Sequence, residues 1–230
     1  MFDLQGYGPS ILIEGTLVTI NVSLVSLAIA AVLGMVGALA KLSGQPLATG
    51  AASVYTTVIR GIPDLVLMLL IFFGGQVFIN QMAPLVGYDD YIDINPFIAG
   101  VITIGFIFGA YMTETFRGAI LAVPRGQIEA GYAYGMTGPQ VFRRVLLPQM
   151  VRHALPGFGN NWLVLLKTTA LVSIIGLDDM VRKAALAAGA TRQPFTFYLV
   201  VALDYLVLTT ISILVLRWAE RRYSAGFRRA

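Results

Sequence analysis

The sequence contains no cysteine and little charge. Without cysteine, its 230 residues cannot form a disulfide framework or a cysteine-ligated metal site. Only 12% of the residues are Asp, Glu, Lys or Arg, which is about half the share of roughly 25% found in soluble domains. The hydrophobic share is 57% and the mean hydropathy is +0.77, so a soluble fold of this length would leave a large apolar surface in water. These features predict an integral membrane protein.

Motifs of several other protein classes are also missing. The chain has no Gly-x-x-x-x-Gly-Lys-Ser/Thr stretch and therefore no loop for binding nucleotide phosphates. The densest acidic group, residues 89–93, contains no histidine, so we expect no metalloenzyme site. Membrane topology explains the net charge of +4 better than nucleic acid binding does. We expect no catalytic residues, no metal, no cofactor on this chain and no nucleic acid partner.

Five apolar stretches are long enough to cross a hydrocarbon core, which takes about 20 helical residues. Each should be a helix, because backbone groups in lipid must be paired within their own segment. Asn160, Asn161 and Lys167 interrupt the fourth stretch, which favours a helix inside the bundle. We predict an all-α, polytopic membrane protein with about five transmembrane helices and a single domain over residues 1–230. The stretches are 11–40, 55–83, 97–123, 155–177 and 195–218.

Positive charges predict the orientation of these helices. If the N-terminus lies outside, twelve Lys and Arg residues fall on the inner side and only Arg182, Lys183 and Arg192 on the outer side. Short cytoplasmic loops carry the excess of Lys and Arg in membrane proteins. We therefore expect an outer N-terminus and a cytoplasmic C-terminus. The twelve inner residues are Lys41, Arg60, Arg117, Arg125, Arg143, Arg144, Arg152, Arg217, Arg221, Arg222, Arg228 and Arg229.

The longest cytoplasmic connection, residues 124–150, has helical composition that is unusual for a loop. It predicts a short helix over 127–136, a break at Gly138 and Pro139, and a second short helix over 140–147 that ends before Pro148. Such a helix suits docking into a groove on another protein. It equally suits an amphipathic helix lying on lipid headgroups.

A signature within this loop resembles the EAA motif of ABC importer permeases. The motif has Glu-Ala-Ala, three residues, Gly, nine residues, Ile, any residue and Leu-Pro, and the spacing matches in full, with Gly and Val in place of the second Ala and the Ile. The resemblance implies the transmembrane domain of a type I ABC importer, in which this loop is the coupling helix that contacts the ATPase subunit. The implied docking residues are Glu129, Ala130, Gly131, Gly135, Val145, Leu147 and Pro148.

Other segments resemble the polar amino acid permeases, especially those for histidine, lysine, arginine and ornithine. They are residues 59–67, 109–118, 156–162 and 167–173. The resemblance implies a bacterial inner membrane protein with a periplasmic N-terminus and a cytoplasmic C-terminus. Its implied partners are ABC subunits that hold ATP and Mg, a second homologous permease and a periplasmic solute-binding protein. A different chain is favoured over a second copy as the other permease.

Two alternatives to a cationic amino acid importer stay open. The same machinery in near relatives carries opines or glutamine. A secondary transporter working alone on an ion gradient belongs to another class and favours an inverted repeat, which the sequence does not show.

Ionisable residues within the apolar stretches are candidates for the solute path, because a charge in the membrane is costly. Asp64 and Glu114 would attract a cationic side chain, and Lys167, next to Thr168, would attract a carboxylate. Asp204 is interpreted as a packing or outer-gate residue.

Each of these residues also has a purely structural interpretation. Asp64 could pair with Arg60, although Pro63 loosens that i, i+4 contact, and Glu114 could pair with Arg117. An ion pair with an acid on a neighbouring helix is favoured for Lys167.

Overall fold

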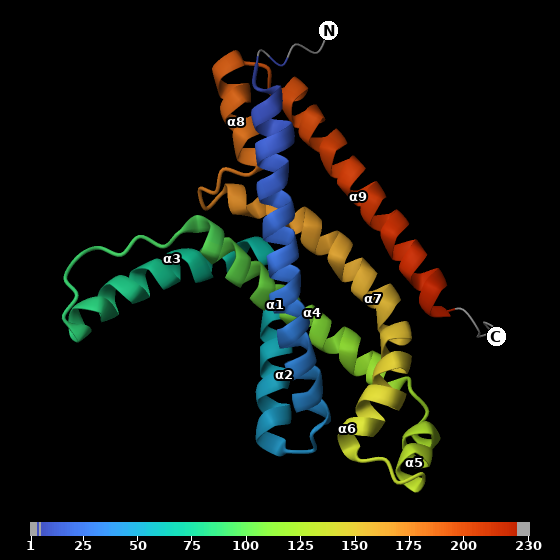
Figure 1. The fold of residues 1–230 in the computed structure, drawn as a ribbon. Coiled ribbons are helices and arrows are strands. Elements are labelled where there is room, and N and C mark those ends of the chain that lie inside the picture. The colour runs from blue at the N-terminus through green and yellow to red at the C-terminus, as the bar shows by residue number, and fades with distance from the viewer. Residues whose placement is uncertain (1–3, 5, 225–230) are drawn as a thin grey trace.

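The computed structural model describes residues 4 and 6–224, and this part of the chain is helical without any strand. The long helix α1 (Thr16–Leu42) stands at the centre, with α4 (Pro96–Leu121) and α7 (Leu147–Thr168) crossing it (Figure 1). The remaining elements are η1 (Ser10–Gly15), α2 (Pro46–Gly61), α3 (Asp64–Met82), η2 (Ala83–Val86), α5 (Arg125–Ala133), α6 (Gly138–Val141), η3 (Phe142–Leu146), η4 (Thr169–Ser173), α8 (Met180–Thr191) and α9 (Pro194–Ser224).

Four helical stretches are long and apolar enough to cross a membrane. They confirm the all-α, polytopic fold class and are Ser10–Leu42, Asp64–Val86, Pro96–Leu121 and Pro194–Tyr223. The predicted stretch 155–177 is not among these four. Its helix, α7, begins eight residues earlier than predicted, at Leu147, and ends at Thr168, and its polar side chains lower its hydropathy.

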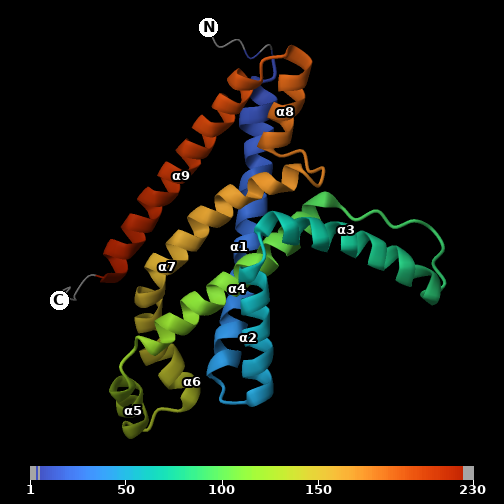
Figure 2. The same cartoon turned by 180° about the vertical axis from the view of Figure 1, so that it is seen from behind.

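The predicted stretch 55–83 is wrong as a single helix. It is broken at Ile62, whose backbone is extended with φ −112° and ψ 138°, and α3 begins after Pro63. The break has a local cause: the residue before a proline is pushed out of the α-helical region, and Pro63 has no N–H with which to continue α2. As a result, α3 leaves the bundle at an angle to α2 (Figures 1 and 2).

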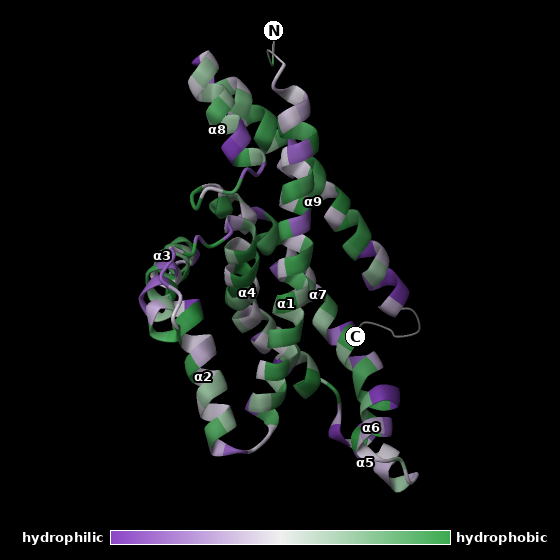
Figure 3. Ribbon diagram, turned by 60° about the vertical axis from the view of Figure 1, so that its left-hand side comes forward, coloured by the Kyte–Doolittle hydropathy of each residue, from purple (hydrophilic) through white to green (hydrophobic). Residues whose placement is uncertain are grey.

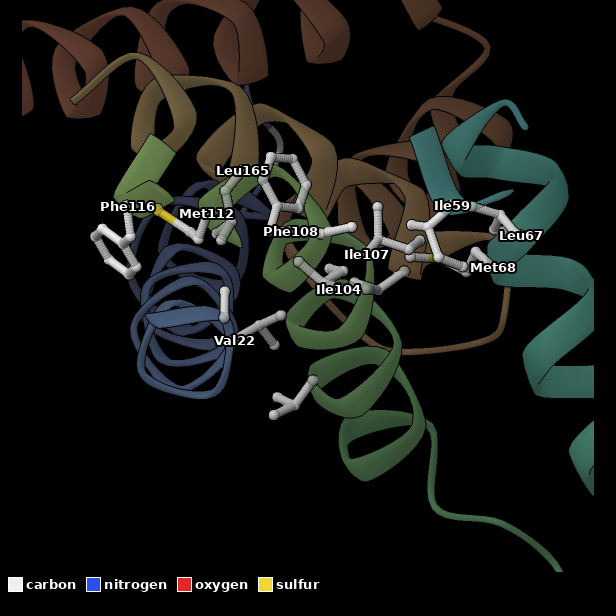
Figure 4. Close-up of a cluster of buried hydrophobic side chains, with 14 of the residues drawn as sticks. Val22, Ile59, Leu67, Met68, Ile104, Ile107, Phe108, Met112, Phe116 and Leu165 are labelled. Atoms are coloured by element: carbon white, nitrogen blue, oxygen red, sulfur yellow. The ribbon is translucent and has the colours of Figure 1, made fainter. Parts of the chain in front are cut away.

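The core is centred on the close packing of α1 against α4. A Cβ atom built at Gly105 would lie 2.6 Å from Ile29 Cγ2, so only glycine permits this approach of the two backbones. Buried Ile104, Ile107 and Phe108 of α4 form the middle of the cluster in Figure 4. Side chains from both sides of the proline break, Ile59, Leu67 and Met68, pack against this cluster (Figure 4).

Helix α7 joins the bundle through a polar contact. Asn161 Nδ2 donates a hydrogen bond to Thr115 Oγ1 of α4 at 2.9 Å, which confirms for this residue the predicted position inside the bundle. Asn160 and Lys167 are exposed on this chain.

Helices α8 and α9 pack around the N-terminal end of α1. Ile11, Met180 and Phe197 are fully buried there, and Lys183 forms an ion pair with Glu14. Asp204 Oδ2 accepts a hydrogen bond from Thr16 Oγ1 at 2.5 Å, so this residue joins α9 to α1. Hydrophobic residues cover much of α1, α4 and α9, whereas α5 and α6 are more polar (Figure 3).

Candidate functional site

The predicted coupling loop forms a small helical unit at the end of the molecule opposite the N-terminus (Figures 1 and 2). Its first helix, α5, begins two residues before the predicted helix over 127–136 and ends three residues before the predicted end, at Ala133. The prediction that a second helix ends before Pro148 is wrong, because α6, η3 and α7 follow one another without a break. The N–H of Leu147 donates to the carbonyl of Phe142, five residues back. Pro148, which has no N–H to donate, follows directly after this wider π-helical turn, and the helix continues through it.

Gly135 ends α5 in a left-handed conformation with φ +76°. Its N–H donates to the carbonyl of Tyr132 at 2.9 Å, and the N–H of Met136 donates to the carbonyl of Gly131 at 3.1 Å. These two bonds form a Schellman motif, which glycine favours because it lacks a Cβ atom. The glycine of the EAA signature therefore sets the turn that follows α5.

The signature residues divide between an inner and an outer face of the loop. Gly131 is buried, and a Cβ atom there would lie 3.1 Å from Val141 Cγ2 and 3.5 Å from Val145 Cγ2. Leu147 packs against the core. These inner residues pack the loop together. Gly131 stands in place of the second alanine of the motif, and because it has no Cβ atom, the Val141 side chain can pack directly against it.

The outer face of α5 carries Glu129 and Ala130, which are both exposed. Tyr132 and Tyr134, 54% and 86% exposed, lie beside them and were not singled out by the sequence analysis. Beside α5, a hollow of about 370 Å³ is lined by Pro139, Gln140, Arg143 and Arg144. The loop thus offers a partner protein exposed aromatic rings next to positive charge. In the sequence, the two tyrosines among the variable positions of the EAA motif could have indicated this aromatic surface.

Glu114 is held by two cations. Its Oε1 lies 2.5 Å from Lys41 Nζ of α1, and its Oε2 lies 3.2 Å from Arg117 Nε. Lys41 also donates to Thr56 Oγ1 of α2 at 2.6 Å. The pairing of Glu114 with Arg117 is therefore present, and the contact with Lys41, a residue whose charge in the sequence indicated only topology, joins α1, α2 and α4.

Asp64 is the first residue of α3 and is half-buried. The alternative pairing with Arg60 is wrong for the described residues, among which Asp64 makes no ion pair and no hydrogen bond. The proline break removes the regular i, i+4 geometry, so the helix no longer sets this pairing, which depends on where the Arg60 side chain turns. The Arg60 guanidinium carbon lies instead 5.5 Å from the centre of the Tyr111 ring of α4.

Lys167 and Thr168 lie at the C-terminal end of α7. Thr168 Oγ1 donates to the carbonyl of Val164 at 3.0 Å. Lys167 forms no ion pair within the described residues, so the favoured pairing with a neighbouring acid is wrong for this part of the chain. No hydrogen bond or ion pair between described residues joins Lys167 or Thr168 to Asp64 or Glu114, and their place on a solute path stays a prediction.

An apolar cavity of about 280 Å³ lies between α1, α4 and α7. None of the four predicted path residues lines it. Its lining residues are Met35, Phe116, Leu147, Met150, Val151, Ala154, Leu155 and Phe158.

Comparison with protein families gives a match over residues 30–225 to the family described as "binding-protein-dependent transport system inner membrane component". The chain belongs to this family. It is therefore a membrane component of a binding-protein-dependent transport system, and the EAA signature and the coupling helix agree with that membership.

Relatives of this permease match along nearly their whole length. The histidine/lysine/arginine/ornithine transport system permease protein HisQ of Escherichia coli (strain K12) is 52% identical over 225 residues, which are 97% of this chain and 98% of the relative. The octopine transport system permease protein OccQ of Rhizobium radiobacter is 44% identical over 230 residues, covering 98% of this chain and 97% of the relative. The arginine ABC transporter permease protein ArtQ of Haemophilus influenzae is 37% identical over 218 residues, covering 94% of both.

Solved structures agree with the fold. A crystal structure of an amino acid ABC transporter with histidines has a TM-score of 0.79 and 33% identity, covering 96% of this chain and 99% of that chain. An inward-facing structure of the MetNI methionine ABC transporter has a TM-score of 0.64, covering 95% of this chain and 97% of that chain. Because the latter is only 23% identical, it bears on the fold alone.

Proposed function

We propose that this permease carries cationic amino acids, namely arginine, lysine, histidine or ornithine, in an ATP-driven importer of the bacterial inner membrane. The observation that carries the proposal is the 52% identity to the histidine/lysine/arginine/ornithine permease over 97% of the chain. The half-buried carboxylate of Asp64, which has no partner among the described residues, supports it, because a cationic side chain would satisfy that charge.

Opines are the second candidate. The octopine and nopaline permeases are 44% and 43% identical to this chain. Their similarity extends over nearly the same length, so solute competition has to separate the two groups.

The proposed assembly contains ATP-binding subunits that hold ATP and Mg, a periplasmic solute-binding protein and a second permease of different sequence. The face of α5 with Glu129, Ala130, Tyr132 and Tyr134 docks onto an ATP-binding subunit. Its exposure at the end of the molecule supports this role (Figure 1). The same end holds the turn after Lys41, whereas the N-terminus and α8 lie at the opposite end. This arrangement supports a periplasmic N-terminus and a cytoplasmic coupling loop.

Uptake by proteoliposomes tests the proposal. The vesicles contain the permease with its ATP-binding subunit, partner permease and binding protein. We expect ATP-dependent uptake of labelled arginine that excess lysine, histidine or ornithine suppresses. Uptake suppressed only by octopine would favour the opine candidate, and uptake driven by an ion gradient without ATP would contradict the proposal.

A further inference from the structure

We infer that Tyr111 is a positioning residue for solute selectivity, because its ring holds the Arg60 guanidinium away from Asp64 and leaves that carboxylate available to the solute. The inference rests on the proposed transport of cationic amino acids. It assigns a role to an aromatic residue of α4 that lies outside the coupling loop.

The backbone around Arg60 and Asp64 is fixed on both sides. Ile59, next to Arg60, is 6% exposed, and Leu67 and Met68, one turn after Asp64, are 5% and 0% exposed. All three pack into the α4 cluster of Figure 4. The break at Ile62 and Pro63 thus leaves Arg60 at the end of α2 and Asp64 at the start of α3, and the buried neighbours of both residues anchor these helix ends to the core.

Tyr111 has a firm support for its ring. The ring centre lies 5.5 Å from that of Phe108, with 34° between the two planes, and Phe108 is 1% exposed. The Arg60 guanidinium carbon also lies 5.5 Å from the Tyr111 ring centre, inside the range of about 6 Å for a cation–π contact. The charges of both Asp64 and Arg60 act on the Tyr111 phenol, so the ring lies close to both groups.

Arg60 therefore has two possible partners. A cation–π contact and an exposed ion pair are of similar strength, so a single change can redirect a long side chain from one to the other. Without the aromatic ring, the guanidinium is free to pair with Asp64, which would neutralise the charge that attracts the solute.

Uptake by the complete transporter in proteoliposomes tests this role. Arginine and histidine are compared at pH 8, where the histidine side chain is mostly neutral. Tyr111→Leu removes the ring and should lower arginine uptake on the order of three- to tenfold relative to histidine. Tyr111→Phe keeps the ring and should behave as the wild type. Adding Arg60→Gln to Tyr111→Leu removes the competing cation and should restore arginine uptake to within about twofold.

Two outcomes for the Tyr111→Leu variant would overturn the inference while the proposed function stands. One is unchanged arginine selectivity in Tyr111→Leu, and the other is a loss that Arg60→Gln does not rescue, which indicates a purely structural role. Arg60→Gln alone keeps the hypothesis testable if Tyr111→Leu inserts poorly. Arg60 is exposed, so this variant should insert normally and retain arginine uptake, and a tenfold loss would also overturn the inference. Absence of any cationic uptake by the wild type would instead contradict the proposed function, and the inference with it.

Discussion

Lys41 at the end of α1 and Glu114 in α4 form an ion pair, with 2.5 Å between Nζ and Oε1. Their side chains are only 13% and 25% exposed. The pair ties the first helix to the central helix of the core beside the α1–α2 turn. Because Arg117 also contacts Glu114, the carboxylate is shared between a buried cation and a more exposed one.

Removing the buried cation should destabilise the fold more than removing the exposed one. We expect Lys41→Met to lower the free energy of unfolding by about 1–3 kcal/mol, since it leaves a partly buried carboxylate short of a partner. Arg117→Gln, at a residue whose side chain is 40% exposed, should cost less than about 1 kcal/mol. Thermal midpoints of the purified permease in detergent measure both effects. Equal losses in the two variants would contradict this order.

Asp64→Asn keeps the size of the side chain and removes its charge. If Asp64 contacts the cationic end of the solute, arginine affinity should fall on the order of 2–5 kcal/mol. Basal ATP hydrolysis and docking of the binding protein should persist. Uptake of arginine and glutamine by the same vesicles, normalised to inserted protein, measures the effect. Equal loss for both solutes would rule out a direct contact between Asp64 and the solute.

Gly135→Phe should weaken docking of the ATP-binding subunit while the permease still inserts. The cause is backbone strain at φ +76°, because no atom lies within 4 Å of a Cβ atom built there. The left-handed conformation costs a non-glycine residue roughly 1–2 kcal/mol, and asparagine tolerates it better. The amount of ATP-binding subunit that co-purifies with the permease should therefore be highest for the wild type, lower for Gly135→Asn and lowest for Gly135→Phe.

Gly126→Ala is the matched control for this series. It lies in α5, has open space at its Cβ position and has no positive φ. It should leave co-purification and transport-coupled ATP hydrolysis unchanged. Normal uptake by Gly135→Phe would exclude the turn from coupling.

Asp179 should make the stability of the α8 end depend on pH. Its Oδ1 accepts a hydrogen bond from the N–H of Arg182 at 2.9 Å, but its buried Oδ2 has no partner within the described part of the chain. Burial raises the pKa of this carboxyl from 3.8 to about 6. The folded protein then holds the proton more tightly than the unfolded chain, so the free energy of unfolding falls as the pH rises from about 4 to about 6.

Asp179→Asn mimics the protonated carboxyl and keeps the acceptor that caps α8. It should remove this pH dependence and raise stability at pH 8 by at most about 2–3 kcal/mol. Thermal midpoints of both proteins at pH 5 and pH 8 test the prediction. A wild-type midpoint that is higher at pH 8 would contradict it.

Topology gives the last prediction. A tag inserted within residues 87–95, between α3 and α4, should be reachable from outside in intact spheroplasts. A reporter fused after Ala230, which lies outside the described residues, should be active only in the cytoplasm. Protection of the tag in intact spheroplasts would contradict the predicted orientation.

The sequence by itself determined the membrane environment, the helical class and the family. Apolar runs must be helices in lipid whatever surrounds them, and the EAA spacing is a property of the linear chain. Gly135 is a similar case: its left-handed turn depends on one residue and its immediate neighbours.

Only the tertiary structure decided which charged side chains meet partners on other helices. Lys41 and Glu114 are 73 residues apart, and no local pattern joins them. Arg60 and Asp64, at helical spacing in the sequence, are separated by the break at Pro63, and Arg60 contacts a ring on α4 instead. The physical reason is that hydropathy and local backbone preferences act within a segment, whereas the partner of a long charged side chain depends on how separate helices pack against one another.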